Sequence, residues 1–180
     1  MKVLRNKLVN NLNIRLEKDF PIEGIEFIDI TPLILQKDVL KEINDKFVAE
    51  VRNKNVDYIV APEARGFLFG AGVANDLNIG LLPVRKKGKL PPSVVEAQVE
   101  YEKEYGFDVL ELPKLVNESY KGKKFYIIDD IYATGNTMKA IIDKIVDLGG
   151  EVVGYGVVLN IVELNNDEKV FSLIDVNEGE

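Results

Sequence analysis

The sequence predicts an α/β domain in which a central, mostly parallel sheet is flanked by helices. Two apolar runs, 126–129 and 152–159, are nearly continuous, which is typical of strands buried on both faces of a parallel sheet. Apolar runs also alternate along the chain with segments of helical periodicity, the pattern of βαβ units. Because no internal repeat, low-complexity tract or Gly/Ser linker interrupts the 180 residues, we expect a single domain.

The individual elements follow from local patterns, taken from the N-terminus onward. Residues 1–20 combine many charges with leucines at every fourth position, which predicts an amphipathic helix built on Leu4, Leu8, Leu12 and Leu16. Helices are also predicted over 39–52 and 67–77, and strands over 58–61 and 81–84. The stretch 89–114 is irregular and polar, which favours a functional lid or hairpin over a core element.

Composition excludes several kinds of chemistry. The chain contains no cysteine and no histidine, so acid–base steps must use carboxylates, lysines or tyrosines. The formal net charge of -7 argues against a nucleic-acid partner. No apolar run approaches the length of a membrane span, and the N-terminus lacks the continuous apolar stretch of a signal peptide. We therefore expect no membrane partner and a cytoplasmic location.

The segment 126–137 carries the strongest functional signal. Its apolar run ends in Asp129 and Asp130, passes through a small, hydroxyl-rich turn, and opens into an amphipathic helix that ends before Gly149 and Gly150. A strand–turn–helix of this kind directs main-chain N–H groups into one concavity, which suits a phosphate dianion. The two carboxylates can accept hydrogen bonds from a vicinal diol. Together they predict a site for a ribose 5-phosphate.

Other interpretations of this segment are weaker. Neither G-x-x-x-x-G-K-[ST] nor G-x-G-x-x-G occurs, so the common nucleotide-binding loops are excluded. An ordinary strand–helix turn, with Asp130 or Thr134 capping the helix, is the alternative. Adjacent acids at the end of a buried strand are costly to desolvate without a ligand or partner, which favours the binding site.

Two further segments are candidates for binding anions. In 62–70, Arg65 offers a planar fork matched to phosphate oxygens, and Gly66 allows a close approach at a helix start. Taken alone, this motif fits equally well an arginine that caps a neighbouring carbonyl. The basic cluster 85–89 follows an apolar run in an acidic protein. Taken alone, such a cluster is more often a solvated loop than an anion site.

These segments resemble known motifs. The segment 126–137 resembles the 5-phosphoribosyl 1-pyrophosphate (PRPP) motif of type I phosphoribosyltransferases. The segments 20–32, 63–67, 83–91 and 104–106 resemble, in the same order, motifs of the adenine phosphoribosyltransferase family. Five motifs in register, spread over about 20–163, are a specific signal. The resemblance implies the type I phosphoribosyltransferase fold, with a small N-terminal hood at about 1–35, a flexible catalytic loop at about 89–106 and the PRPP motif at about 126–138.

The resemblance also implies roles for the matching residues. Asp129 and Asp130 would hold the ribose hydroxyls of PRPP. The 5-phosphate would be bound by a loop made of Ala133, Thr134, Gly135, Asn136 and Thr137. The pyrophosphate would be contacted by Ala64, Arg65, Arg85, Lys86 and Lys89.

The base and the catalytic loop follow in the same way. Adenine would stack on Phe27, with Ile161 on its opposite face, and its edge would be read by the main chain at Glu26 and Ile28. The catalytic residues implied are Glu104, Tyr105 and Arg65, with the Glu104 carboxylate approaching N7 of adenine.

The implied reaction joins adenine to the ribosyl group of PRPP, giving AMP and pyrophosphate in purine salvage. Magnesium would arrive with PRPP, because the sequence offers no dedicated set of protein ligands, and the family resemblance suggests a homodimer. Transfer to a 6-oxopurine or xanthine is one alternative, and a non-catalytic PRPP-binding module is another. The oxopurine enzymes typically place a lysine near the exocyclic oxygen, and residues 161–164 contain none, which favours adenine.

The chain departs from the family pattern at several positions. Ile28 stands where arginine is common, Tyr132 is bulkier than the usual aliphatic residue, and 100–103 is more highly charged than usual. Asn136 replaces the second glycine of the phosphate loop. Asparagine is the non-glycine residue that best tolerates a left-handed backbone, which is how we interpret this replacement.

Overall fold

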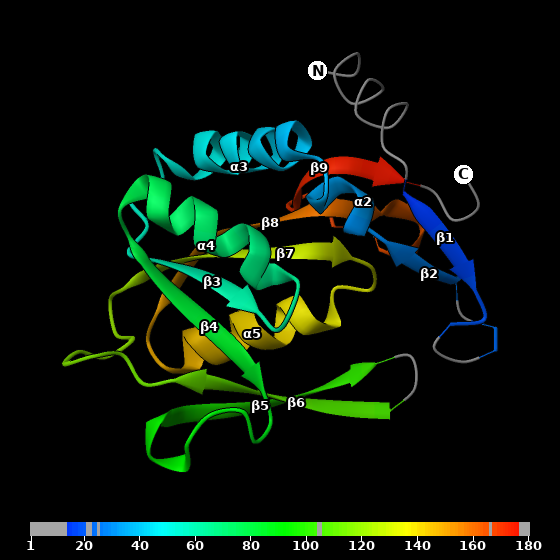
Figure 1. Cartoon of the computed structure of the whole chain (residues 1–180). Helices are drawn as coiled ribbons and strands as arrows, with labels where there is room; N and C mark the ends of the chain where they lie inside the picture. Colours follow the sequence, from blue (N-terminus) through cyan, green and yellow to red (C-terminus); the bar gives the residue numbers. More distant parts are fainter. Residues whose placement is uncertain (1–13, 21–22, 25, 104–105, 166, 177–180) are drawn as a thin grey trace.

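The computed structural model describes residues 14–20, 23–24, 26–103, 106–165 and 167–176. Within these residues, seven strands form one sheet in the order β5-β6-β4-β3-β7-β8-β9, and a separate two-stranded sheet pairs β1 with β2 (Figure 1). The strands of the large sheet are β3 (Tyr58–Pro62), β4 (Gly80–Lys86), β5 (Val95–Lys103), β6 (Gly106–Pro113), β7 (Lys124–Tyr132), β8 (Glu151–Ile161) and β9 (Phe171–Val176). The small sheet contains β1 (Arg15–Lys18) and β2 (Glu26–Asp29).

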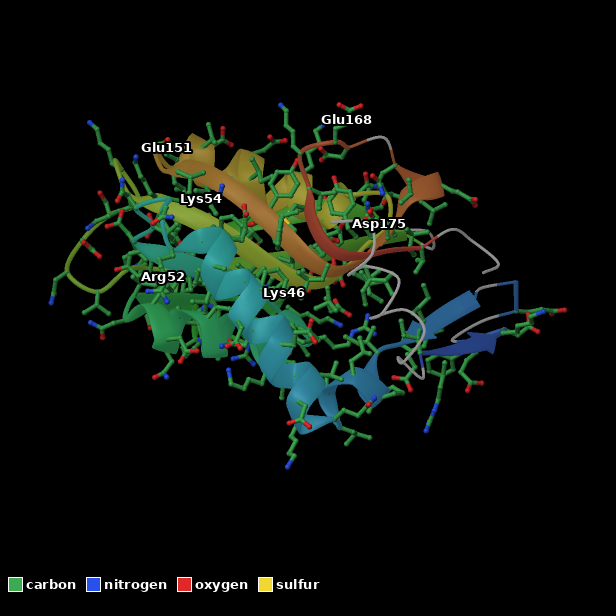
Figure 2. The ribbon with its side chains drawn as sticks, turned by 90° about the horizontal axis from the view of Figure 1, so that it is seen from above. Lys46, Arg52, Lys54, Glu151, Glu168 and Asp175 are labelled. Carbon is green, nitrogen blue, oxygen red and sulfur yellow. The ribbon has the colours of Figure 1, made fainter. Side chains whose placement is uncertain are left out.

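The helices pack on both faces of the large sheet. Among the described residues they are α2 (Thr31–Ile34), α3 (Lys37–Val51), α4 (Gly66–Leu77) and α5 (Asn136–Asp147), with short 3-10 helices at Pro92–Val94 and Val162–Leu164. In Figure 1, α3 and α4 cover one face and α5 covers the other. Seen from above in Figure 2, α3 lies across the sheet, with charged side chains such as Lys46 toward solvent.

The predicted α/β architecture is confirmed. The pairs β4–β3, β3–β7, β7–β8 and β8–β9 are parallel, whereas β6 joins β4 in the antiparallel sense and β5 joins β6 likewise. The sheet is therefore mostly parallel, with an antiparallel hairpin at one edge. A hairpin is one of the two forms expected for the irregular stretch 89–114, but the expectation that this stretch lies outside the core is wrong. Four of its side chains are buried in an apolar core, namely Val99, Tyr101, Leu110 and Leu112.

The topology places two loops side by side. From β3 the chain crosses to β4 on one side, and from β7 it crosses to β8 on the other. Crossovers of one hand that run in opposite directions put their helices on opposite faces, which is why α4 and α5 lie on different sides. The boundary between β3 and β7 is a topological switch point, where ligands of α/β proteins usually bind.

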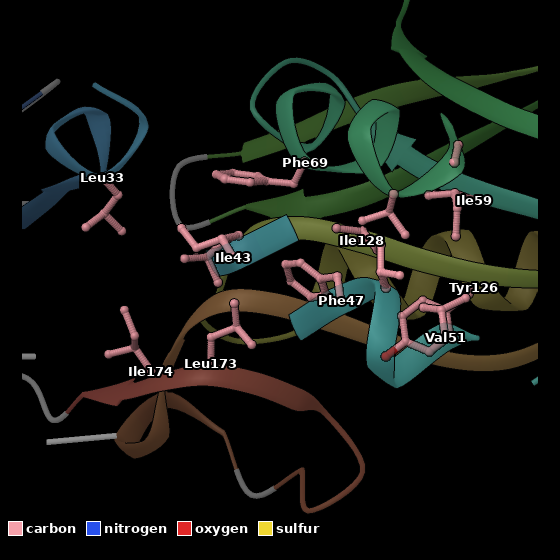
Figure 3. Packing of buried hydrophobic residues seen from close by; sticks show 14 of the residues in the cluster. Leu33, Ile43, Phe47, Val51, Ile59, Phe69, Tyr126, Ile128, Leu173 and Ile174 are labelled. Carbon is pink, nitrogen blue, oxygen red and sulfur yellow. The ribbon is translucent and has the colours of Figure 1, made fainter. Parts of the chain in front are cut away.

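Two apolar cores sit between the sheet and its helices. Because side chains alternate along β7, Tyr126 and Ile128 face the α3–α4 core, while Phe125 and Ile127 face the α5 core. Figure 3 shows Phe47 of α3 in the first core. Phe47 is fully buried, and its replacement by alanine would cost about 3–5 kcal/mol of unfolding free energy. The continuous apolar pattern of β7 reflects burial on both faces.

The N-terminal helix prediction is wrong over the residues that can be checked. Residues Arg15–Lys18 form β1, with Leu16 opposite Ile28 of β2 in an antiparallel pair. A four-residue spacing is also an even spacing, so it places leucines on one face of a strand as well as on one face of a helix. Pairing with β2 satisfies the backbone of this segment. Leu4, Leu8 and Leu12 lie outside the described residues.

Candidate active site

A cavity of about 490 Å³ lies at the carboxyl ends of β3 and β7. Its wall combines the loop after β3, the loop after β7, one side chain from β2 and two from the edge hairpin. The lining residues are Phe27, Pro62, Glu63, Ala64, Arg65, Lys86, Tyr101, Leu110, Asp129, Asp130, Ile131, Ala133, Thr134, Asn136 and Thr137. Four predicted groups, for the base, the pyrophosphate, the ribose and the 5-phosphate, therefore meet around one cavity.

The loop after β7 is shaped for an anion. Gly135 takes a left-handed conformation with φ of 78° and is the cap residue of α5. A glycine cap brings no side-chain acceptor, so it leaves the first N–H groups of α5 to a ligand. Neither Asp130 nor Thr134 is the helix cap, which rules against the ordinary turn as the explanation of this motif.

Our interpretation of Asn136 is wrong. Asn136 is the first residue of α5, and the left-handed residue of the loop is Gly135. A position inside the first helical turn accepts most side chains, so asparagine there needs no special backbone tolerance. Asn136 lines the cavity, as do its neighbour Thr137 and, on the other side of Gly135, Thr134.

Asp129 and Asp130 lie within β7 rather than beyond its end. Asp130 is 6% exposed, and its Oδ2 is a buried atom that has no hydrogen bond among the described residues, although Arg65 Nε lies 2.6 Å away as an ion pair. Asp129 Oδ1 accepts a hydrogen bond of 2.9 Å from the Asp130 N–H. A buried carboxylate oxygen whose partner is an arginine still has lone-pair capacity to accept a hydrogen bond from a ligand hydroxyl.

The environment of Asp129 disfavours its charged form. Burial, followed by repulsion from the Asp130 carboxylate, raises the pKa of Asp129 well above its ordinary value of 3.8. The Asp130 N–H and the Arg65 charge oppose this shift without cancelling it. Two adjacent acids that resist joint ionisation mark a site where a bound ligand changes the electrostatic balance.

Arg65 lines the cavity and contacts two other residues of its wall. It directly precedes α4 and follows a cis peptide bond between Glu63 and Ala64. Its guanidinium pairs with Asp130 and lies 5.3 Å from the ring centroid of Phe27. Arg65 thus connects the residue expected to stack on the base with a residue expected to hold the ribose.

The basic cluster is organised by two acids. Glu63 Oε2 accepts hydrogen bonds from Arg85 Nε at 3.0 Å and from the Lys86 N–H at 2.9 Å. Glu111 is 3% exposed and accepts hydrogen bonds from the N–H groups of Gly88 and Leu90. The pKa of Glu63 lies below its ordinary value chiefly because of the Lys86 N–H, even though burial opposes the shift. Both acids therefore fix the backbone that carries the predicted pyrophosphate cations.

The predicted pyrophosphate residues are not all on the cavity wall. Lys86 lines the cavity with Ala64 and Arg65, whereas Arg85 pairs with Glu63 and lies 5.9 Å from the ring centroid of Phe67. Lys89 is exposed in the turn after β4 and is not a lining residue.

Among the described side chains of the residues predicted to contact the base, only that of Phe27 lines the cavity. Phe27 lines the cavity from β2, and the Phe20 ring meets it edge to face, with centroids 5.1 Å apart. Ile28 packs toward the α3–α4 core, and Ile161 ends β8 without lining the cavity. The backbone of Glu26 pairs with Lys18.

The structure describes only part of the predicted catalytic loop. Glu104 and Tyr105 lie outside the described residues, between β5 and β6. The hairpin does contribute Tyr101 and Leu110 to the cavity wall, which sequence reasoning missed. It also missed the loop-holding role of Glu63 and Glu111. The alternation of apolar and charged residues in 95–113 was the available signal, because it marks paired strands with one covered face.

The cavity combines a helix N-terminus, an acid pair in which Asp130 is buried and Asp129 half-buried, and two cations, a set that fits a sugar carrying phosphate groups at two positions. Fold and site together define a phosphoribosyl-transfer domain, and a family model described as "Phosphoribosyl transferase domain" matches residues 33–176.

Individual relatives narrow this class. The chain is 48% identical to the adenine phosphoribosyltransferase of Clostridium acetobutylicum over 88% of this chain and 90% of the relative, and 46% identical to that of Clostridium novyi over 87% and 89%. The crystal structure of the adenine phosphoribosyltransferase from Thermoanaerobacter pseudethanolicus matches with a TM-score of 0.83 and 36% identity, over 94% of this chain and 99% of that one. The chain belongs to the adenine phosphoribosyltransferase family.

Proposed function

We propose that this protein transfers the 5-phosphoribosyl group of PRPP to adenine, giving AMP and pyrophosphate. The observation that carries the proposal is the buried Oδ2 of Asp130, which forms an ion pair with Arg65 and lines the same cavity as the phosphate loop before α5. An acceptor suited to a ribose hydroxyl thus lies between two sites suited to anions. A solved structure of the Saccharomyces cerevisiae adenine phosphoribosyltransferase, described as complexed with an imino-altritol bisphosphate and adenine, matches with a TM-score of 0.82 and 33% identity over 97% of this chain and 100% of that one.

The mechanism is electrostatic. As the bond to pyrophosphate breaks, positive charge develops on the ribosyl ring and negative charge on the leaving group. Asp129 and Asp130 would hold the ring hydroxyls, while Arg65 and Lys86 would stabilise the departing pyrophosphate. The Ala133–Thr137 loop would fix the 5-phosphate, so that the anomeric carbon is held in place for attack.

Arg65 would change partners during binding. Its guanidinium now neutralises Asp130 and covers Phe27. When ribose hydroxyls occupy the acids and pyrophosphate arrives, a charge-assisted contact with phosphate oxygens can replace the ion pair. Moving the guanidinium would uncover the Phe27 ring for adenine, with the β1–β2 sheet acting as the hood over the base.

Magnesium fits this site as part of the substrate complex. Among the described residues, no group of three or more acids could hold a metal ion by itself. Mg²⁺ usually keeps several waters and binds through substrate phosphates. Arg65, Lys86 and the Ala64 backbone would hold the magnesium-bound pyrophosphate. Magnesium would neutralise charge on that leaving group.

Assays with four bases test the proposal. The purified protein is incubated with PRPP, magnesium and radiolabelled adenine, hypoxanthine, guanine or xanthine, and labelled nucleotide is separated from free base. We expect AMP formation to exceed that of every other nucleotide by at least about 100-fold in kcat/KM, because a site that reads polar edges by hydrogen bonds strongly rejects mismatched analogues. A preference for hypoxanthine or xanthine would support the 6-oxopurine or xanthine alternative. Binding of PRPP without any turnover would support a non-catalytic module.

Glu104→Gln tests the proposed proton-handling role. This change keeps the size of the side chain and removes its basicity, so kcat should fall about 10-fold or more while the Kd of PRPP stays within about 3-fold. Glu100→Gln is the matched control, because it removes an acid from the same hairpin and should leave kcat within about 2-fold. An unchanged kcat in Glu104→Gln, or an equal loss in both variants, would overturn the assignment.

Two further properties are proposed from the family resemblance. We propose a homodimer, which sedimentation would detect as a species of twice the 20.2 kDa chain mass. We also propose a cytoplasmic location, which cell fractionation would test. Among the described residues, no helix is both long and apolar enough to cross a bilayer.

A further inference from the structure

A cluster of side chains behind the phosphate loop is not part of the cavity wall. Asp167, in the turn between Val162–Leu164 and β9, accepts hydrogen bonds from two tyrosines at its Oδ2. The donors are Tyr132 at 2.8 Å and Tyr155 at 2.5 Å, and the two rings stack with centroids 6.2 Å apart. Asp167 Oδ1 accepts a third hydrogen bond, from the Lys169 N–H at 2.9 Å. The Asp167 carboxylate thus accepts three hydrogen bonds, and neither it nor the two tyrosines line the cavity.

The protonation states favour these contacts at neutral pH. Burial would raise the pKa of Asp167, but hydrogen bonds from Tyr155, the Lys169 N–H and Tyr132 outweigh it, so the pKa lies below its ordinary value of 3.8. Burial and the hydrogen bond to Asp167 raise the pKa of both tyrosines above the ordinary value of 10.0. A charged carboxylate therefore faces two neutral phenols, an arrangement that gives strong, charge-assisted hydrogen bonds.

Tyr132 connects Asp167 to the phosphate loop, because it contacts both Asp167 and Gly135. It is the last residue of β7 and is 7% exposed, and its hydroxyl lies where a side chain on Gly135 would have to go. The three atoms nearest to that position all belong to Tyr132. The anchored phenol thus packs directly against the left-handed residue that begins α5.

Asn165 forms a second tie to the same loop. Its Nδ2 donates hydrogen bonds to the carbonyl oxygens of Ala133 and Ile161, each at 2.9 Å, and its Oδ1 accepts one from the Asp167 N–H at 3.1 Å. In a trans peptide the carbonyl and the following N–H point in opposite directions. Holding the Ala133 carbonyl from behind therefore directs the Thr134 N–H toward the cavity that Thr134 lines.

We propose that Asp167 and Asn165, acting through Tyr132 and the Ala133 carbonyl, are positioning residues that preorganise the phosphate loop for the 5-phosphate of PRPP. They touch no substrate. They set the direction of the loop N–H groups before the ligand arrives, so that binding does not have to order the loop. The inference deepens the proposed function and rests on it. It also explains the bulky Tyr132, because an aliphatic side chain could not reach Asp167 with a hydroxyl.

Tyr132→Phe and Tyr155→Phe form a matched pair for the test. Each removes one phenol hydroxyl from the same carboxylate oxygen, but only Tyr132 lies against Gly135. Ribose 5-phosphate, which carries the 5-phosphate without pyrophosphate, is the probe. Its Kd is measured by calorimetry on each variant, together with Tm, kcat and the KM values for PRPP and adenine.

We expect Tyr132→Phe to raise the Kd of ribose 5-phosphate and the KM of PRPP about 5-fold or more, while the KM of adenine stays within about 2-fold. Tyr155→Phe should leave all three within about 2-fold even if its Tm falls as far. Asn165→Ala should repeat the Tyr132→Phe pattern. Equal changes in Kd for the two tyrosine variants, or no change in Tyr132→Phe and Asn165→Ala, would show that the cluster is only structural.

The parent protein separates this inference from the proposed function. If the parent binds ribose 5-phosphate and makes AMP while the variants bind as it does, the positioning role fails and the function stands. If the parent makes no AMP and binds no ribose 5-phosphate, the proposed function fails first.

Discussion

The two loops that meet at the β3–β7 switch point are built in different ways. The loop after β3 relies on charged side chains, since Arg65 pairs with Asp130 and Glu63 pairs with Arg85. The loop after β7 relies on main-chain groups around Gly135, held from behind by Tyr132 and Asn165. Both are strand–turn–helix segments in sequence. In the proposed function, the first presents ions that would change partners when a ligand binds, and the second presents a backbone whose shape would be set in advance.

The difference suits the two anions proposed for the site. A 5-phosphate stays bound throughout the reaction, so a fixed cradle of N–H groups serves it well. A pyrophosphate must bind and then leave with more negative charge, and mobile cationic side chains can follow that change. We therefore expect a preorganised loop after β7, at the 5-phosphate, and a loop after β3 whose charged side chains exchange partners, at the pyrophosphate. Asp129 and Asp130 would bind the ribose between these two loops.

The largest expected effect comes from the acid pair that both loops share. Asp129→Asn combined with Asp130→Asn should lower kcat/KM at least about 100-fold, because each lost hydrogen bond to a charged acceptor is worth about 1.5–3 kcal/mol. Tm should hold or rise, since burial and repulsion from Asp130 disfavour the charge on Asp129. Steady-state kinetics and thermal melts of the double variant check both statements. Near-normal activity would show that Asp129 and Asp130 do not bind the ribose.

The loop built on ions should respond most to loss of its arginine. Arg65→Ala should raise the KM of PRPP and the Ki of pyrophosphate about 10- to 100-fold, the equivalent of one charge-assisted contact of about 1.5–3 kcal/mol. The Kd of ribose 5-phosphate should change much less, because its phosphate binds the other loop. Product-inhibition kinetics and calorimetry supply the two numbers. Pyrophosphate that inhibits the variant as tightly as the parent would reduce Arg65 to a structural role.

The loop built on backbone should respond most to its glycine. Gly135→Ala puts a side chain on a residue at φ of 78° and against the Tyr132 hydroxyl. A left-handed alanine costs about 1–2 kcal/mol, so the Kd of ribose 5-phosphate should rise about 10-fold, measured by calorimetry.

Gly66→Ala is the matched change in the other loop. Gly66 has no left-handed backbone, but an added Cβ would lie 2.9 Å from Pro62 Cδ and 3.0 Å from Asp129 Oδ1. Gly66→Ala should therefore lower Tm and weaken the binding of the ribose hydroxyls more than it weakens the binding of the 5-phosphate. Equal effects of the two alanines on the Kd of ribose 5-phosphate would erase the distinction between the loops.

The smallest expected effect is on stability as a function of pH. Because the pKa of Asp129 is raised above 3.8, the folded protein binds a proton at pH values where the unfolded chain does not. Stability should therefore rise as pH falls through the raised pKa toward 3.8, and gain nothing more below it. Thermal melts of ligand-free protein between about pH 7 and 5 should show a rise in Tm that Asp129→Asn lacks. Glu63 acts in the opposite direction, but only below its ordinary value of 4.5, because its pKa is lowered.

Much of the fold and the site could be predicted from local pattern. Helical spacing predicted α3, α4 and α5 to within about three residues of their ends, and apolar runs predicted β3, β4, β7 and β8. The motifs around Arg65 and Asp129 named most of the cavity wall. These predictions succeeded because burial on one or two faces leaves a periodic record in the sequence.

Other features depend on which segments pair. Arg15–Lys18 forms a strand because β2 lies beside it, although its leucine spacing also fits a helix. The interpretation of Asn136 failed because the point where α5 begins decides which loop residue is left-handed. Arg85 contacts Glu63, 22 residues away, rather than lining the cavity, because β3 and β4 are neighbours in the sheet. Local spacing carries no record of such partners.

By itself, the sequence determined an α/β domain with two anion-suited turns, an acid pair and no histidine or cysteine chemistry. Tertiary structure alone decided that Arg65 neutralises Asp130, that Glu111 fixes the basic turn, and that Tyr132 reaches Asp167 across 35 residues. The physical reason is that periodicity reports only whether a side chain is buried. The partner it meets there is set by strand order and crossover direction, which bring together residues distant in the chain.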